Sequence, residues 1–280
     1  MDALGSLRER WENAEWQVRA SLALEIGKLG TPEAEKFLAE VLRNEKNYFV
    51  RGFAALALSH AKGLETILLL AEKLNKEAIF QCDENVFVRA RCAEALGNNA
   101  VSIKGLGGAA RGLVLSSLRK SLGDEPMVVE KAIPALGKLG DRESVGRMYR
   151  ATQEKLVALD GKIDLGPVAL AMCEMGITEP HALGAYVNIL VGSQDMELAG
   201  KVMEKVRELL RGNPTIDMGG KISSAIRTYL NKCELAKAAE KHGGSYVDSV
   251  LGRVKKPSYM GEGKLPRPSQ EQKAIRLKLK

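Results

Sequence analysis

Histidine and cysteine are the residue types here most often used for catalysis or metal binding, and neither forms a recognisable pattern. His60 is followed by Ala61, and His181 begins a new helix, so neither belongs to an H-E-x-x-H zinc helix. His242 falls in the last turn of a helix, where a partial positive charge is favourable. Without a C-x-x-C pair, the cysteines predict no zinc site and no disulfide framework, and we expect core packing for the second and third; they are Cys82, Cys92, Cys173 and Cys233.

Two glycine-containing stretches could bind phosphate groups, but each lacks a residue that the chemistry needs. Gly105-Leu106-Gly107-Gly108 begins like a dinucleotide fingerprint, yet Ala110 takes the last glycine position and no strand precedes it. Gly220-Lys221 is followed by Ile222 rather than by Ser or Thr, which excludes a phosphate loop. Carboxylates are abundant, but no spacing pairs them. We therefore predict no catalytic residues, no cofactor and no metal, and expect that the chain is not an enzyme.

Three arginines in a repeating position are the first charge feature with a possible function. Arg19, Arg51 and Arg89 should form a row along stacked helices, roughly 10 Å apart. Such a row could bind an acidic partner. Alternatively, and by our preference, each arginine bonds a carboxylate or helix end of the adjacent repeat as a structural ladder. The carboxylates available for it are Glu15, Glu45, Asp83 and Glu84.

The C-terminus is the second charge feature. Residues 254–280 carry a net charge of +6 out of +7 for the whole chain, so the rest is close to neutral. Their prolines and glycines predict an extended arm. The arm could be merely solubilising, attract a nucleic acid or other polyanion, or pair with a protein partner as a strand, because apolar and basic residues alternate at its end. Its candidate partner-binding residues are Lys255, Lys256, Arg267, Lys273, Ile275, Arg276, Leu277, Lys278 and Leu279.

A short sequence pattern that recurs along the first half of the chain predicts the helices that position these residues. Val18-Arg19-Ala20, Val50-Arg51-Gly52 and Val88-Arg89-Ala90 each open a helix, and Val128-Val129-Glu130 is a weaker copy; the openings are 32, 38 and 40 residues apart. Nine residues after each opening valine stand Gly27, Ser59, Gly97 and Gly137. This is the period of a helical repeat, whose units bury their apolar faces by stacking. We expect antiparallel helix pairs stacked in order, with the four valines at equivalent buried positions.

Local signals mark where the predicted helices begin and end. The first repeat helix ends at Gly27-Lys28-Leu29-Gly30, and Thr31-Pro32-Glu33 supplies a cap, a first-turn proline and a first-turn carboxylate for the next helix. Asn47 and Asn85 are natural caps of later repeat helices. We expect Phe49 and Phe87 to fill the joints between repeats, and Leu4, Leu7 and Trp11 to form an N-terminal capping helix.

The repeat segments resemble HEAT repeats, in particular the short-loop kind also found in phycobilisome lyases. The resemblance is carried by NAEWQVRASLALEIGKLGTPEAEKFLAEVL at 13–42, NEKNYFVRGFAALALSHAKGLETILLLAEKL at 44–74, DENVFVRARCAEALGNNA at 83–100 and DEPMVVEKAIPALGKLGDRESVGRMY at 124–149, within about 13–176. It implies an all-α, right-handed α-solenoid of stacked antiparallel helix pairs, usually a scaffold or adaptor. The histidines here do not form the His-Glu pairs of the HEAT-repeat iron hydroxylases that act on deoxyhypusine.

Composition agrees with this fold and sets the remaining expectations. The chain is 45% hydrophobic but only 5% aromatic, as closely stacked helices built from Ala, Leu and Val require. No apolar run approaches the roughly 20 residues of a membrane span, and no signal peptide is evident, so we expect a cytoplasmic protein. We expect a capping helix at 1–12, HEAT-like repeats at 13–182, degenerate or capping helical repeats at 183–253 and the basic tail at 254–280. The predicted function is non-enzymatic scaffolding between proteins; the alternatives are nucleic-acid association through the tail and, less favoured, a bilin-chromophore lyase.

Overall fold

A computed structural model describes residues 3–75, 82–156, 166–178, 180–192, 196–213, 215 and 220–242. The candidate tail residues from Lys255 to Leu279 lie outside these described residues. The chain divides into two compact units, residues 1–229 and 230–280. All regular structure in the described residues is helical, which confirms the predicted all-α fold. Among the described helices, none combines the length and the apolar character needed to cross a membrane.

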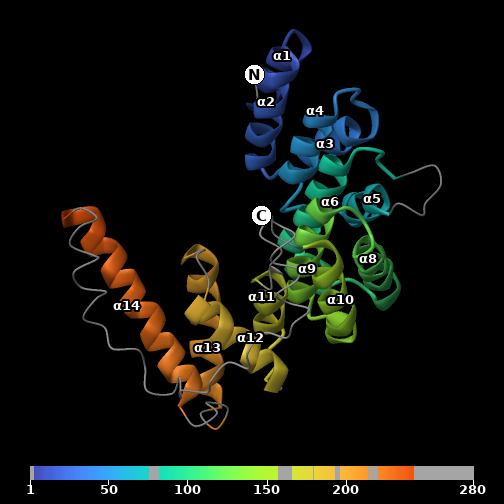
Figure 1. The fold of residues 1–280 in the computed structure, drawn as a ribbon. Helices are drawn as coiled ribbons and strands as arrows, with labels where there is room; N and C mark the ends of the chain where they lie inside the picture. Colours follow the sequence, from blue (N-terminus) through green and yellow to red (C-terminus); the bar gives the residue numbers. More distant parts are fainter. Residues whose placement is uncertain are drawn as a thin grey trace, which may run out of the picture. The chain divides into compact units, whose positions relative to one another are not determined.

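The helices of the first unit form two layers (Figure 1). In one layer each helix contacts the next in sequence order, and its members are α2 (Trp16–Lys28), α4 (Tyr48–Ala57), α6 (Val86–Asn98), α9 (Pro126–Leu139), α11 (Gly166–Glu174) and α13 (Met196–Gly212). The second layer holds the alternate helices α3 (Pro32–Asn44), α5 (Leu64–Leu74), α8 (Gly108–Ser121), α10 (Val145–Lys155) and α12 (Pro180–Gly192). The remaining elements are α1 (Ala3–Glu12), α7 (Ala100–Lys104), the 3-10 turn η1 (Arg142–Ser144) and α14 (Lys221–His242). The stacked helix pairs expected from the repeat are therefore present.

The predicted helix caps are confirmed by their hydrogen bonds. The Asn47 side chain accepts hydrogen bonds from the amides of Phe49 and Val50, and Asn85 accepts one from the amide of Phe87. Thr31 caps α3 by accepting from the amide of Ala34. Each cap satisfies an amide that the first helical turn leaves without a partner, so the repeat helices begin where the sequence places them.

Three of the four opening valines occupy the expected buried positions, and one does not. Val50, Val88 and Val128 are fully buried in α4, α6 and α9. Val18 in α2 is 47% exposed, so its predicted burial is wrong. In the layer that contains them, α4, α6 and α9 each have a helix on both sides, whereas α2 begins the layer and has only the short helix α1 before it. An end position in a stack cannot be buried by a preceding repeat.

The glycines nine residues after the valines allow adjacent helices to approach closely. A Cβ added at Gly137 would lie 2.5 Å from the Cα of Ala171, and one at Gly97 would lie 3.0 Å from the Cα of Ala135. At Gly27 the added atom would meet the Ala57 carbonyl oxygen at 2.7 Å. The left-handed conformation that favours glycine occurs instead at Gly30 and the equivalent Gly140. The helix ends therefore lie where the sequence predicts them, but this glycine position serves helix packing.

Aromatic side chains fill the first joints between repeats, as expected. The Phe49 ring lies 5.3 Å from the Trp16 ring and 5.4 Å from the Phe87 ring, centroid to centroid. Trp11 of α1 meets Phe37 of α3 edge-on, with 5.3 Å between centroids. These contacts place apolar surface between consecutive helices, and they attach the N-terminal helix to the first pair.

Candidate partner-binding groove

Two of the three repeat arginines form bidentate ion pairs across the joints. Arg51 donates to both carboxylate oxygens of Asp83 at 2.6 and 2.9 Å, and Arg89 donates to both of Asp124 at 2.7 and 2.8 Å. Arg89 also donates to the carbonyl oxygens of Asp83 and Glu84, and its side chain is only 4% exposed. Hydrogen bonding to the carboxylates raises the pKa of both guanidinium groups despite their burial. These pairs hold each helix to the turn that leads into the next repeat.

The arginine ladder weakens towards both ends. Arg19 contacts Glu45 through one 3.2 Å ion pair and is 29% exposed, and the fourth position of the ladder is the buried Val129. Asp124 was not among the carboxylates expected from the sequence, although it precedes its repeat valine by four residues, much as Glu45 and Asp83 precede theirs by five. The ladder occupies the polar atoms of Arg51 and Arg89, so these two side chains have few donors left for a partner.

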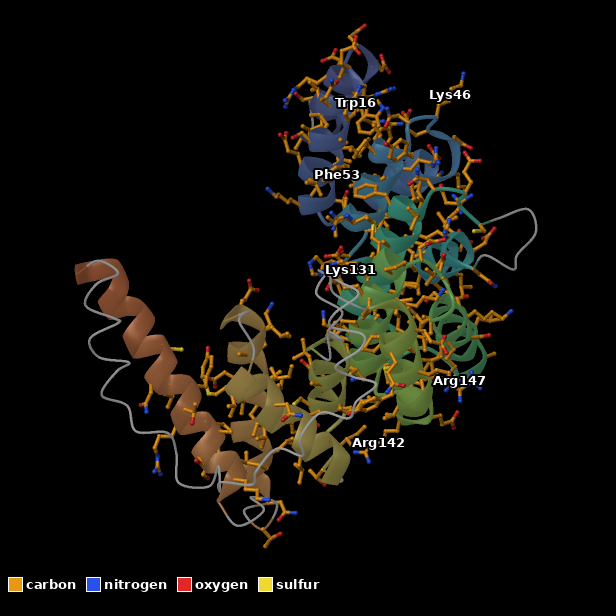
Figure 2. The ribbon with its side chains drawn as sticks, in the orientation of Figure 1. Trp16, Lys46, Phe53, Lys131, Arg142 and Arg147 are labelled. Atoms are coloured by element: carbon orange, nitrogen blue, oxygen red, sulfur yellow. The ribbon has the colours of Figure 1, made fainter. Side chains whose placement is uncertain are left out.

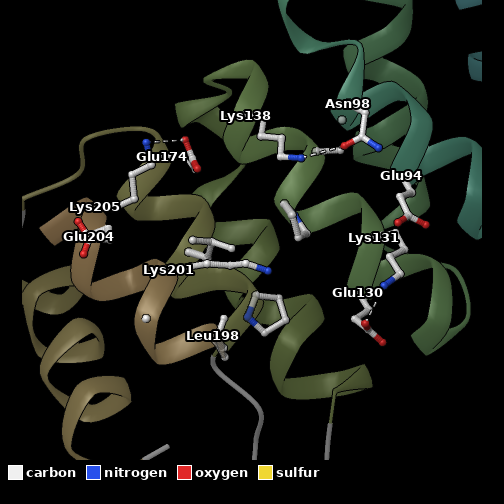
Figure 3. A pocket seen from close by; sticks show the side chains of 16 residues that line it. Glu94, Asn98, Glu130, Lys131, Lys138, Glu174, Leu198, Lys201, Glu204 and Lys205 are labelled. Carbon is white, nitrogen blue, oxygen red and sulfur yellow. Dashed lines mark hydrogen bonds and ion pairs between the residues drawn. The ribbon is translucent and has the colours of Figure 1, made fainter. Parts of the chain in front are cut away.

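A groove of about 750 Å³ lies along α6, α9, α11 and α13 in the first unit (Figure 3). We call it the α6–α13 groove. Its apolar floor includes Pro134, Ala135, Pro167, Leu170 and Leu198. Its volume falls within the range of about 300–1,000 Å³ typical of ligand sites, but it runs over four helices rather than closing around one point. Such a surface suits an elongated ligand.

Charged side chains of both signs surround this floor and sum to zero formal charge. They are Lys131, Lys138, Lys201 and Lys205 together with Glu94, Glu130, Glu174 and Glu204. The Lys201 side chain extends across the groove (Figure 3). Lys138 donates to the amide oxygen of Asn98 at 3.1 Å, and Lys205 lies 3.7 Å from Glu174. Both contacts are reached by solvent and are therefore weak, so a partner can exchange them for its own charges at small cost.

Helical periodicity places these residues on one side of the stack. On α9, Met127, Lys131, Pro134 and Lys138 recur at i, i+4, i+7 and i+11, and Phe87, Arg91, Glu94 and Asn98 follow the same spacing on α6. Pro134 also has no amide hydrogen, so the Glu130 carbonyl lacks its usual helical donor. This surface was not predicted, because a polar helical stripe looks the same whether it faces bulk solvent or a groove. Pro134, a proline inside a helix, was the sequence feature that could have indicated this surface.

The described residues show no metal-binding cluster of three or more His, Cys, Asp or Glu side chains. His60 is exposed. Cys92 and Cys173 are buried, as expected, and burial raises the pKa of both thiols, that of Cys173 to about 12. Gly107 precedes α8 as its N-terminal cap residue.

Of the comparisons with known proteins, the one with protein families agrees with this architecture. Residues 2–96 match a family model described as HEAT repeats. A search of curated proteins found no match. Among solved structures, the crystal structure of an engineered protein is similar at 16% sequence identity and a TM-score of 0.37, over 82% of this chain and 96% of that chain. A score this low carries no argument about fold or function.

Proposed function

We propose, from the match of residues 2–96 to the HEAT-repeat family model, that the chain is an interaction scaffold whose α6–α13 groove binds a segment of a partner polypeptide. HEAT repeats are generally scaffolds for protein interactions and are typically non-catalytic. Stacked repeats create extended surfaces of the kind on which such proteins bind their partners. The observation that supports this choice of site is the groove itself, because it joins an apolar floor to charges of both signs.

The groove lining indicates the chemistry of the bound segment. Pro134, Leu170 and Leu198 offer apolar contacts, which supply affinity when water is excluded. The eight surrounding charges are balanced, so a strongly acidic or strongly basic segment gains little from the groove as a whole. The segment that fits carries two or three apolar residues flanked by both acidic and basic ones. Polar donors of the segment can pair with the Glu130 carbonyl that Pro134 leaves without a helical partner.

Affinity capture with a groove variant tests this function. Lys131→Glu with Lys201→Glu reverses two charges beside the floor without removing a buried contact, since Lys131 and Lys201 are 34% and 57% exposed. We expect the variant to keep its helical signal and to lose the polypeptides that the wild-type chain captures from extract. The captured polypeptides are compared by quantitative mass spectrometry, and the binding segment is then located with overlapping peptides.

Lys36→Glu with Lys46→Glu is the matched control, because both residues are exposed and neither lines the groove. The control should capture the same polypeptides as wild type. Equal capture by the groove variant and the wild-type chain would contradict the assignment of the partner site to the groove.

No described residue favours the bilin-lyase alternative. That the chain is not an enzyme also stays a prediction from the sequence. The cytoplasmic location and the boundaries at residues 12, 182 and 253 stay predictions from the sequence.

A further inference from the structure

The net charge of the second helix layer of the first unit changes sign along the chain. Together, α3 and α5 contain five acidic and three basic residues, a net charge of −2. Together, α8, η1 and α10 contain seven basic and two acidic residues, a net charge of +5, and α8 itself contains no carboxylate side chain. The near-neutral total of the helical body therefore hides a local basic surface. We call it the α8–α10 basic face and define it by Arg119, Lys120, Arg142, Arg147 and Arg150.

Arg119 joins the two helices of this face around one buried carboxylate. It donates to Asp141 through two hydrogen bonds of 2.5 and 2.9 Å and to the exposed Glu143 at 3.0 Å. Asp141 is 5% exposed and also accepts a hydrogen bond from the Ser144 hydroxyl. Arg147 contributes to the field at Asp141 without a direct ion pair. Arg119 thus supplies structure, as does Arg142, which donates to the Met175 carbonyl oxygen at 2.7 Å.

Arg147 and Arg150 provide the available charges. Both are exposed, lie one turn apart on α10, and form no ion pair within the described part of the chain. Figure 2 shows Arg147 on the side of the stack opposite Lys131, which lines the groove. The face is therefore separate from the proposed partner groove.

The composition of this face selects the kind of partner. From Arg142 to Lys155 no large apolar side chain is exposed, and on α8 one such side chain, that of Leu113, is exposed. A lone leucine does not form the apolar or aromatic centre around which stable protein interfaces are built. No exposed aromatic ring is present there to stack unpaired bases, as single-stranded nucleic acids require. Arginine is well suited to phosphate oxygens, and binding to a phosphate backbone is mainly electrostatic.

We propose that the α8–α10 basic face binds the phosphate backbone of duplex nucleic acid without reading its sequence. This inference is independent of the groove and gives the scaffold a second surface on its other helix layer. The net charge of +6 in residues 254–280 adds a second source of phosphate contacts in the same chain. Substitutions in the face alone separate its contribution to duplex binding from that of the tail, because each phosphate contact adds its own part to the salt dependence of the affinity.

Fluorescence anisotropy with a labelled DNA duplex of mixed sequence, across a range of KCl concentrations, tests the proposal on the full chain. The test variant is Arg147→Glu with Arg150→Glu. The control is Lys36→Glu with Lys46→Glu, which makes the same change in net charge at exposed residues outside both the face and the groove. We expect the test variant to bind about tenfold or more weakly than the control at moderate salt. Its salt slope should fall by about 1.8, because each phosphate that the protein no longer neutralises lowers the slope by about 0.9.

Three outcomes would overturn the proposal. The first is equal binding and equal slopes for the two variants, which would place duplex binding in the tail. The second is the absence of duplex binding by the wild-type chain at low salt. The third is displacement of the duplex by polyglutamate at an equal concentration of negative charge, which would indicate an acidic protein partner. Arg147→Gln with Arg150→Gln gives a milder neutralisation and should show the same direction of change if the reversed charges perturb folding.

Discussion

Replacing Arg89 by alanine should be among the most destabilising single substitutions in the ladder. The change removes a bidentate bond to Asp124 and two bonds to backbone carbonyls, and it strands a carboxylate that is 2% exposed. Removing one partner of a buried ion pair costs about 3–5 kcal/mol. For a chain of this size, about 2–4 °C of melting temperature corresponds to each kcal/mol, so the midpoint should fall by about 6–20 °C. Thermal and urea unfolding followed by far-ultraviolet circular dichroism measure the effect.

Two further variants show whether the stranded charge is the cause. Arg19→Ala is the control in the same repeat position, where a single ion pair of a 29% exposed arginine predicts a loss of about 0–1 kcal/mol. Adding Asp124→Asn to Arg89→Ala should recover part of the loss, because the amide oxygen still accepts from the Glu125 amide but carries no charge. If Arg89→Ala unfolds no more easily than Arg19→Ala, the buried ion pair does not stabilise the joint between repeats.

Three other predictions follow from packing, protonation and burial. Gly137→Ala should lower the unfolding free energy by about 1–3 kcal/mol through overpacking, whereas Gly112→Ala in open space on α8 should raise it by up to about 1 kcal/mol; chemical denaturation measures both. Burial favours the neutral form of Asp141, but hydrogen bonds from Arg119 and Ser144 outweigh it and lower the pKa of this carboxyl below its ordinary value of 3.8. The ionised Asp141 therefore contributes its full stabilisation above pH 3.8, and this contribution is lost as the pH falls through the folded-state pKa. The gap in unfolding midpoint between wild type and Arg119→Ala should accordingly be wide near neutrality and close in strong acid; a gap that stays constant would exclude Asp141 as its source. A thiol reagent at mildly alkaline pH should modify the partly exposed Cys82 and Cys233 before the buried Cys92 and Cys173, and equal rates for all four thiols in the folded chain would contradict their assigned burial.

Features set by nearby residues were predictable from the sequence. The caps at Asn47 and Asn85 depend on amides two or three residues away, so their geometry follows from helix formation alone. The repeat period likewise predicted the order of stacking, since each unit must bury its face on a neighbour. The repeated position of Arg51 and Arg89 likewise predicted that each would bond a carboxylate of the adjacent repeat.

Features that depend on the neighbouring repeat were less predictable. Asp124 pairs with Arg89 across 35 residues, and its turn is one residue shorter than the equivalent turns before Val50 and Val88. The exposure of Val18 reflects the end of the stack, which a periodic pattern cannot reveal. Gly97 follows the rule for a helix end in the sequence, but its role depends on how closely α9 approaches.

The groove and the basic face were missed for a common reason. Lys131 and Arg147 are both polar residues on helix surfaces, and sequence alone does not say which charges gather on one side of a stack. Net charge over the whole body also averaged the acidic α3 and α5 with the basic α8 and α10. Only the arrangement of the helices separates these surfaces.

Site-specific photo-crosslinking in cells tests the central claim, that the α6–α13 groove binds a partner polypeptide. A photoreactive phenylalanine analogue replaces Lys201 in the groove or, as control, Leu113 on α8, two sites that are 57% and 59% exposed respectively. We predict a discrete crosslinked polypeptide from position 201 and not from position 113, with the attachment in a segment that carries apolar residues and charges of both signs. Crosslinking from position 113 with none from position 201 would contradict the claim.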